Sequence, residues 1–268
     1  MGRRTLDGGT PEGWFIPYRY AGQANAQMVH TGLMRRFEER RPDFQTVLET
    51  ISTYRKDLLG IGLDDPAPKP RWNQDWFAGL DAAAAYAIVR TRQPRRIVEV
   101  GSGHSTRFMA RAILDGGFDC LLTAIDPEPR ADISALPVQI HRKVVQQAPR
   151  KPFEALRDGD ILFIDSSHIL MPGTDVDLLF GEIVPALPAG VIVHIHDIFL
   201  PLPYPPEWSL RGYNEQNALA PMLMGGVLEP LFACQFARSA MAAAVERQTG
   251  FIPRPKANHD ASLWTVRT

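Results

Sequence analysis

The feature that most constrains the fold of this sequence is an alternation of short apolar runs with longer helix-favouring stretches, which starts near residue 95. The runs cover residues 96–100, 120–125, 138–145, 160–164 and 190–195. Helices are predicted over residues 105–115, 175–187 and 214–224. Strands that alternate with helices in this way predict a parallel sheet covered by helices on both faces.

The two ends of the chain depart from this alternation. Residues 228–236 and 262–266 read as two further strands, the second of them terminal, which predicts a doubly wound, Rossmann-like α/β sheet of seven strands. Before residue 93 the sequence favours helices, with an amphipathic helix or helix pair over residues 28–52 and a helix over residues 80–92. We therefore predict an N-terminal helical cap or lid over residues 1–92 and a catalytic domain over residues 93–268.

Charge and composition narrow the classes of function. The chain has 29 Lys and Arg against 30 Asp and Glu, and this balance disfavours a nucleic-acid partner. Its longest unbroken apolar run, residues 82–89, is too short to span a membrane. Cys120 and Cys234 form no paired motif, which favours a reducing cytoplasmic location. Self-association as a homo-oligomer stays open.

The first predicted strand runs directly into a glycine turn. Gly101, Ser102 and Gly103 follow Val100, and a helix is predicted from Ser105. Glycines let the backbone turn sharply and approach a ligand closely, while the free N–H groups of the next helix favour polar or anionic groups. The turn matches only the G-x-G part of the dinucleotide-binding fingerprint, which has a further glycine. A tight strand-to-helix turn that binds no ligand is therefore the alternative.

Acidic and imidazole side chains follow the other predicted strands. Asp126 lies 25 residues after Gly101, where a carboxylate can bind a ribose diol, although a turn or helix-cap role is the alternative. The carboxyl ends of parallel strands meet at one edge, so we expect the remaining tip residues to face the same ligand. Such groups can bind a divalent metal or supply a general base. They are Asp165, His168, His196 and Asp197.

Two of the strand residues have a plainer interpretation. His194 lies deeper in its strand than His196 and is interpreted as a hydrogen-bonded residue of the sheet. His196 and Asp197 at the tip can also be an orienting hydrogen-bonded pair.

Glu99 with its Gly-Ser-Gly turn, Asp126, Asp165 and Asp197 resemble the successive motifs of class I S-adenosylmethionine-dependent methyltransferases. The resemblance covers about residues 95–268 and includes a reversed last strand at residues 263–266. It implies S-adenosylmethionine as the cofactor. The turn residues, with Ser105 at the start of the helix, would surround its methionine portion and Asp126 would bind the ribose hydroxyls. Glu99 would hold either the turn or the cofactor's amino group.

A second likeness is to metal-dependent catechol-type O-methyltransferases, which hold magnesium through an acidic residue after the fourth strand and an Asp-Asn pair after the fifth. Asp165 and Asp197 match two of these positions, but Ile198 stands where the amide is expected. His168 or His196 could complete a site, with a preference for a softer ion than magnesium. In the metal-free alternative one of these histidines deprotonates the acceptor.

We therefore predict methyl transfer to an oxygen or nitrogen of a small molecule. Asp165, His168, His196 and Asp197 would activate this acceptor directly or through a metal. Residues 208–216 are candidates for acceptor recognition, Arg107 and Arg130 for binding a substrate carboxylate or for surface ion pairs, and Trp72, Trp76 and Phe77 for a lid or for core packing. The alternatives are an NAD(P)-dependent oxidoreductase and a non-catalytic nucleotide-binding module.

Overall fold

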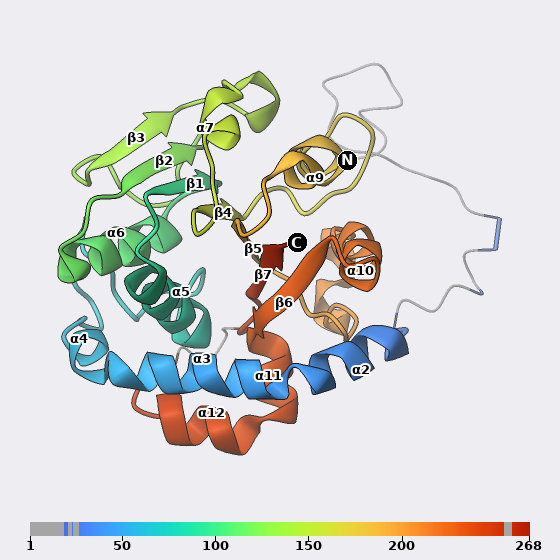
Figure 1. The fold of residues 1–268 in the computed structure, drawn as a ribbon, viewed down its shortest axis with the longest axis horizontal. Helices are drawn as coiled ribbons and strands as arrows, with labels where there is room; N and C mark the ends of the chain where they lie inside the picture. The colour runs from blue at the N-terminus through green and yellow to red at the C-terminus, as the bar shows by residue number, and fades with distance from the viewer. Residues whose placement is uncertain (1–18, 21–22, 24–26, 255–258) are drawn as a thin grey trace.

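The structure, a computed structural model, describes residues 19–20, 23, 27–254 and 259–268 (Figure 1). The start of the predicted cap, residues 1–18, and residues 21–22, 24–26 and 255–258 lie outside the described residues. None of the helices in the described ranges is long and apolar enough to cross a bilayer.

A seven-stranded sheet with the order β3-β2-β1-β4-β5-β7-β6 forms the centre of the molecule. The first five strands pair in parallel, whereas β7 runs antiparallel to both β5 and β6. The predicted doubly wound fold with a reversed last strand is therefore confirmed. The strands are β1 (Arg96–Val100), β2 (Leu121–Ile125), β3 (Val138–His141), β4 (Ile161–Ile164), β5 (Ile192–Ile195), β6 (Leu228–Ala233) and β7 (Leu263–Arg267).

The helices between the strands follow the predicted spacing, with one interruption. The predicted helix over residues 175–187 is broken by a π-helical turn, η3 (Leu179–Ile183), between α8 (Asp175–Leu178) and α9 (Val184–Ala186). The other helices of this part are α5 (Gly79–Arg92), α6 (His104–Gly116), α7 (Lys151–Glu154) and α10 (Gln216–Met224), with the 3₁₀ turns η2 (Val145–Gln147) and η4 (Pro206–Arg211).

The N-terminal part contains the predicted helix pair, α2 (Thr31–Glu39) and α3 (Arg41–Thr53), followed by α4 (Arg55–Leu59). Figure 1 shows α3 running along one side of the molecule beside α11 (Cys234–Ala240) and α12 (Ala242–Thr249), and α3 also contacts α5 and β6. Its buried Phe44 belongs to the same hydrophobic core as Ile97 of β1. The helices before β1 are thus packed onto the sheet through one continuous core.

The predicted strand over residues 228–236 is too long. The strand ends at Ala233, and α11 (Cys234–Ala240) and α12 (Ala242–Thr249) follow it. The Phe236 ring packs edge-on against Phe37 and Phe44, at centroid distances of 5.6 and 5.7 Å. Burial against α2 and α3 therefore replaces the strand pairing that the alternating apolar residues suggested.

Candidate active site

A cavity of about 810 Å³ lies where β1, β2, β4 and β5 reach their carboxyl ends. This is the edge of a doubly wound sheet at which ligands bind. The structure brings nine of the ten predicted site residues to the cavity wall, and only Glu99 does not line it. The nine are Gly101, Ser102, Gly103, Ser105, Asp126, Asp165, His168, His196 and Asp197.

The glycine turn packs tightly against the end of β4. Gly101 has φ +78°, and a Cβ atom there would overlap the carbonyl oxygen of Asp165. Only glycine tolerates both the backbone conformation and this approach. Glu99 supports the turn from below: its two carboxylate oxygens accept hydrogen bonds from Ser105 Oγ and Thr106 Oγ1, both at 2.6 Å. Of the two roles considered for Glu99, the geometry favours holding the turn.

Asp126 ties the turn to the end of β2. Its Oδ2 accepts hydrogen bonds from Ser102 N at 2.6 Å and Ser102 Oγ at 2.9 Å, and its Oδ1 accepts one from Glu128 N at 2.8 Å. The turn-forming role considered for Asp126 is therefore present. Because a carboxylate oxygen has two lone pairs and Asp126 lines the cavity, its Oδ1 can accept one more hydrogen bond, from a ligand.

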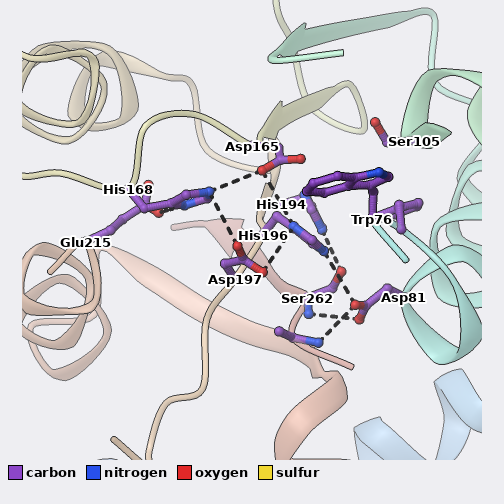
Figure 2. Close-up of polar contacts among 12 residues, drawn as sticks. Trp76, Asp81, Ser105, Asp165, His168, His194, His196, Asp197, Glu215 and Ser262 are labelled. Atoms are coloured by element: carbon purple, nitrogen blue, oxygen red, sulfur yellow. Dashed lines mark hydrogen bonds and ion pairs between the residues drawn. The ribbon is translucent and has the colours of Figure 1, made fainter. Parts of the chain in front are cut away.

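Beside the turn, two imidazoles and two carboxylates form a cluster. Figure 2 shows the rings of His168 and His196 pointing toward Asp165 and Asp197. His168 Nε2 lies 3.3 Å from Asp165 Oδ1 and 3.6 Å from Asp197 Oδ2. His196 Nδ1 lies 3.5 Å from Oδ1 of each aspartate. His168 and Asp197 have positive φ angles, +61° and +55°, so the backbone is strained at two members of the cluster.

The electrostatics of the cluster favour charged imidazoles. Burial alone would lower the pKa of His168, but its hydrogen bonds with Asp165 and Glu215 outweigh burial and raise this pKa well above its ordinary value. Burial likewise opposes the charge of His196, yet the charges of Asp197 and Asp165 raise its pKa well above the ordinary value. The pKa of Asp165 is held well below its ordinary value because both imidazoles outweigh its burial. As arranged, the histidines are hydrogen-bond donors rather than bases.

Two further carboxylates lie behind the imidazoles (Figure 2). Glu215, directly before α10, is fully buried and its Oε2 lies 2.8 Å from His168 Nδ1. Asp81, in the first turn of α5, has Oδ2 3.5 Å from His196 Nε2. Carboxylates behind imidazoles fix the orientation of the rings. Asp81 is not among the residues predicted from the sequence, and Glu215 is predicted only as part of the acceptor-recognition segment or as a helix start.

His194 is a residue of the sheet, in agreement with its interpretation from the sequence. Its ring is buried and stacks on Phe163 at a centroid distance of 3.7 Å. His194 Nε2 is 2.9 Å from Ser262 Oγ. The ring does not line the cavity.

The predicted metal ligands do not form a coordination site in this arrangement. Within the described ranges, no group of three or more His, Cys, Asp or Glu side chains is placed to hold a metal ion. The imidazole nitrogens that face the cluster are paired with Asp165 and Asp197, and Ile198 is a buried apolar residue without a ligand atom. The catalytic roles proposed for these residues do not involve a metal ion.

The aromatic residues considered for a lid divide into two groups. Trp72 and Phe77 are buried and pack against Phe108, with centroid distances of 5.1 and 6.4 Å, so they belong to the core. Trp76 is 55% exposed and lines the cavity, with the guanidinium of Arg130 4.0 Å from its ring centroid. Phe77 also lines the cavity although it is buried, and Trp76 is the exposed ring of the three.

Several solved structures have a similar fold at low sequence identity. SAH-bound methyltransferase PaMTH1 of Podospora anserina is 14% identical, with a TM-score of 0.45, over 82% of this chain and 88% of that chain. A structure named cmcI-N160 SAH is 16% identical, with a TM-score of 0.41, over 79% and 91% of the two chains. The plantazolicin methyltransferase BpumL, in complex with a triazolic desmethylPZN analog and SAH, is 11% identical, with a TM-score of 0.40, over 89% and 90%. No curated protein matches the sequence significantly.

A family of methyltransferase domains matches residues 98–198, which run from β1 to just beyond β5. This segment contains the glycine turn and all four members of the imidazole–carboxylate cluster. Together with the reversed β7, the match confirms the predicted resemblance to methyltransferases that use S-adenosylmethionine. The match identifies residues 98–198 as a methyltransferase domain.

Proposed function

We propose that the chain uses S-adenosylmethionine, bound on the glycine turn, to methylate an oxygen of a small molecule held at the imidazole–carboxylate cluster. The observation that carries this proposal is the position of the cluster, which lines the same cavity as Gly101, Ser102 and Gly103. A shared cavity lets both reactants be held in line, and this orientation supplies most of the rate enhancement of a transfer reaction.

The charges of the cluster suit an oxygen acceptor. A hydroxyl becomes a better nucleophile as it loses its proton, and the positive imidazoles of His168 and His196 would stabilise the negative oxygen that results. The side chain of Asp165 is 35% exposed and can accept a hydrogen bond from the hydroxyl, which orients it toward the methyl group. The hydroxyl proton leaves to solvent as the new C–O bond forms. Nitrogen acceptors gain nothing from positive neighbours, so oxygen is favoured.

The remaining predicted properties belong to this proposal as well. We place the boundary between the N-terminal cap and the catalytic domain at residue 92, at the end of α5. The cytoplasm is the proposed location, supported by the two free cysteines, Cys120 and Cys234. The proposed methyl transfer uses residues of one chain and does not require a homo-oligomer.

Variants at the two halves of the cavity test the proposal. Asp126→Ala should weaken binding of S-adenosylhomocysteine about tenfold or more, because Asp126 shapes the turn and faces the cofactor half. Asp197→Ala should leave this affinity within about threefold but reduce turnover by roughly tenfold to a hundredfold, because Asp197 contacts both imidazoles and fixes their orientation. Calorimetry measures the first effect and methyl transfer to a panel of hydroxyl compounds measures the second.

The result that would overturn the assignment is unchanged turnover in both Asp197→Ala and His168→Ala. A metal held by Asp165 and Asp197 is the second candidate mechanism. It would be favoured if dialysis against EDTA abolished turnover and a divalent ion restored it, whereas the direct mechanism predicts no effect of EDTA.

A further inference from the structure

Beyond the cluster, the cavity has an aromatic wall made by residues of η4 and the segment around it. Trp208, Tyr213 and His259 line the cavity there. Their rings contact one another, with Trp208 5.7 Å from Tyr213 and 5.3 Å from His259 between centroids. Phe199 supports Trp208 from behind at 5.0 Å. Trp208 itself is only 9% exposed, so the half-buried ring of Tyr213 is the aromatic surface that this wall offers to a ligand.

A guanidinium without a carboxylate partner lies on this wall. The Arg211 guanidinium is 3.8 Å from the ring centroid of Trp208 and 5.5 Å from that of Tyr213. Within the part of the chain that the structure describes, it makes no hydrogen bond or ion pair, and Arg211 lines the cavity. A guanidinium stacked on an aromatic face keeps its N–H edge free, and this edge matches a carboxylate in a bidentate pair.

The wall continues directly into the imidazole–carboxylate cluster. The ring of Tyr213 lies 4.5 Å from that of His168 between centroids, and His168 contacts Asp165. A planar molecule resting on Tyr213 would therefore have one end at the cluster and the other at Arg211, whose guanidinium covers the ring of Trp208. The cluster's own carboxylates already have imidazole partners, so Arg211 is available for a charge on the ligand.

The other cavity arginine has a different position. Arg130 lies over Trp76, and its backbone N–H donates to the Ser102 carbonyl oxygen at 3.1 Å, so it belongs to the glycine-turn half. Arg107, also considered for a substrate carboxylate, donates to the Asp132 carbonyl oxygen at 3.0 and 2.7 Å. Arg211 is thus the cation on the acceptor side among the arginines that line the cavity.

We propose that the acceptor is an aromatic hydroxyl compound that carries a carboxylate, with its ring on Tyr213 and its carboxylate paired with Arg211. This inference rests on the proposed function, because the reacting hydroxyl is the end that reaches Asp165 and His168.

Calorimetry on the protein saturated with S-adenosylhomocysteine tests the inference. The probes are 3,4-dihydroxybenzoate and its methyl ester, which differ by the carboxylate charge. The acid should bind about tenfold more tightly than the ester, as one charge-assisted pair at a partly exposed site allows. Arg211→Gln should remove this preference while S-adenosylhomocysteine affinity stays within about twofold. Arg247→Gln, an exposed arginine of α12 outside the cavity, is the matched control and should keep the preference.

Three results would overturn the inference: equal affinity for acid and ester, no binding of either probe, or a preference that survives in Arg211→Gln. The first titration separates this inference from the proposed function. If S-adenosylhomocysteine binds and the acid is not preferred, the acceptor class alone is wrong. If S-adenosylhomocysteine does not bind, the proposed function fails with it.

Discussion

Gly101 occupies a position that admits no side chain, since a Cβ atom there would meet the Asp165 carbonyl oxygen at a positive φ. Gly117, which ends α6, has a similar φ of +61° but nothing within 4 Å of its would-be Cβ. The two glycines therefore separate the backbone cost of a positive φ from the steric cost of the contact with Asp165.

We predict that Gly117→Ala lowers the free energy of unfolding by about 1–2 kcal/mol, the cost of the left-handed conformation alone. Gly101→Ala should cost at least ~3 kcal/mol, because the end of β4 must also move. Urea unfolding curves measure both losses. Equal losses in the two variants would contradict the close contact between Gly101 and the Asp165 carbonyl oxygen.

The stability of the folded state depends on pH through the side chain of Glu99. Burial raises its pKa from the ordinary 4.5 to about 8, although the hydroxyls of Ser105 and Thr106 pull in the other direction. The folded state therefore holds this proton more tightly than the unfolded state. The resulting stability is complete below pH 4.5 and is lost as the pH rises through 8.

We predict that the wild-type protein loses stability, on the order of 3 kcal/mol, from this group between pH 4.5 and 8. Glu99→Gln cannot titrate, so its free energy of unfolding should fall less over the same range. Denaturation of both proteins at several pH values provides the comparison. Parallel curves for the two proteins would contradict the raised pKa.

At the scale of elements, reciprocal hydrogen bonds join the start of α5 to the segment that enters β7. Asp81 accepts hydrogen bonds from the backbone N–H groups of Ala261 and Ser262, both at 2.9 Å. Asp260 accepts one from Leu80 N at 2.9 Å. All three bonds are buried, and Asp81 also lies beside His196 of the active site.

We expect Asp81→Ala to lower the free energy of unfolding by roughly 2–5 kcal/mol, because two buried N–H groups lose their acceptor. Asp81→Asn keeps one oxygen acceptor and should lose less. Asp43→Ala, which removes a half-exposed carboxylate on α3, is the control and should change stability by about 1 kcal/mol or less. A loss no greater than that of the control would rule out the joining role of Asp81.

The elements that the sequence predicted well are those with a local signal. The apolar β-rich runs place β1, β2, β4 and β5 within about one or two residues of their observed bounds, and the segment Gly79–Arg92 is helical as its composition indicates. The prediction failed after Ala233, since Phe236 is buried by Phe37 and Phe44, which lie about 190 residues earlier in the chain. A contact at that separation leaves no trace in the local pattern.

At the scale of the whole molecule, the sequence predicts which strand ends meet at the cavity. It does not predict which side chains contact the site residues from the side away from the cavity. Asp126, Asp165 and Asp197 could be assigned to one cavity because parallel strands end at a common edge. Asp81 and the pairing of Glu215 with His168 could not, since they depend on how α5 and the turn before α10 pack against the sheet. The same packing raises the pKa of both imidazoles, and this direction favours hydrogen-bond donation by the two histidines.

The central claim is that the cavity at the carboxyl end of the sheet holds S-adenosylmethionine and not a nicotinamide dinucleotide. Parallel calorimetric titrations with S-adenosylhomocysteine and NAD test it most directly. The predicted result is saturable binding of S-adenosylhomocysteine, weakened in Asp126→Ala, with no heat of binding for NAD at the same concentrations. Tight binding of NAD with no response to S-adenosylhomocysteine would contradict the claim.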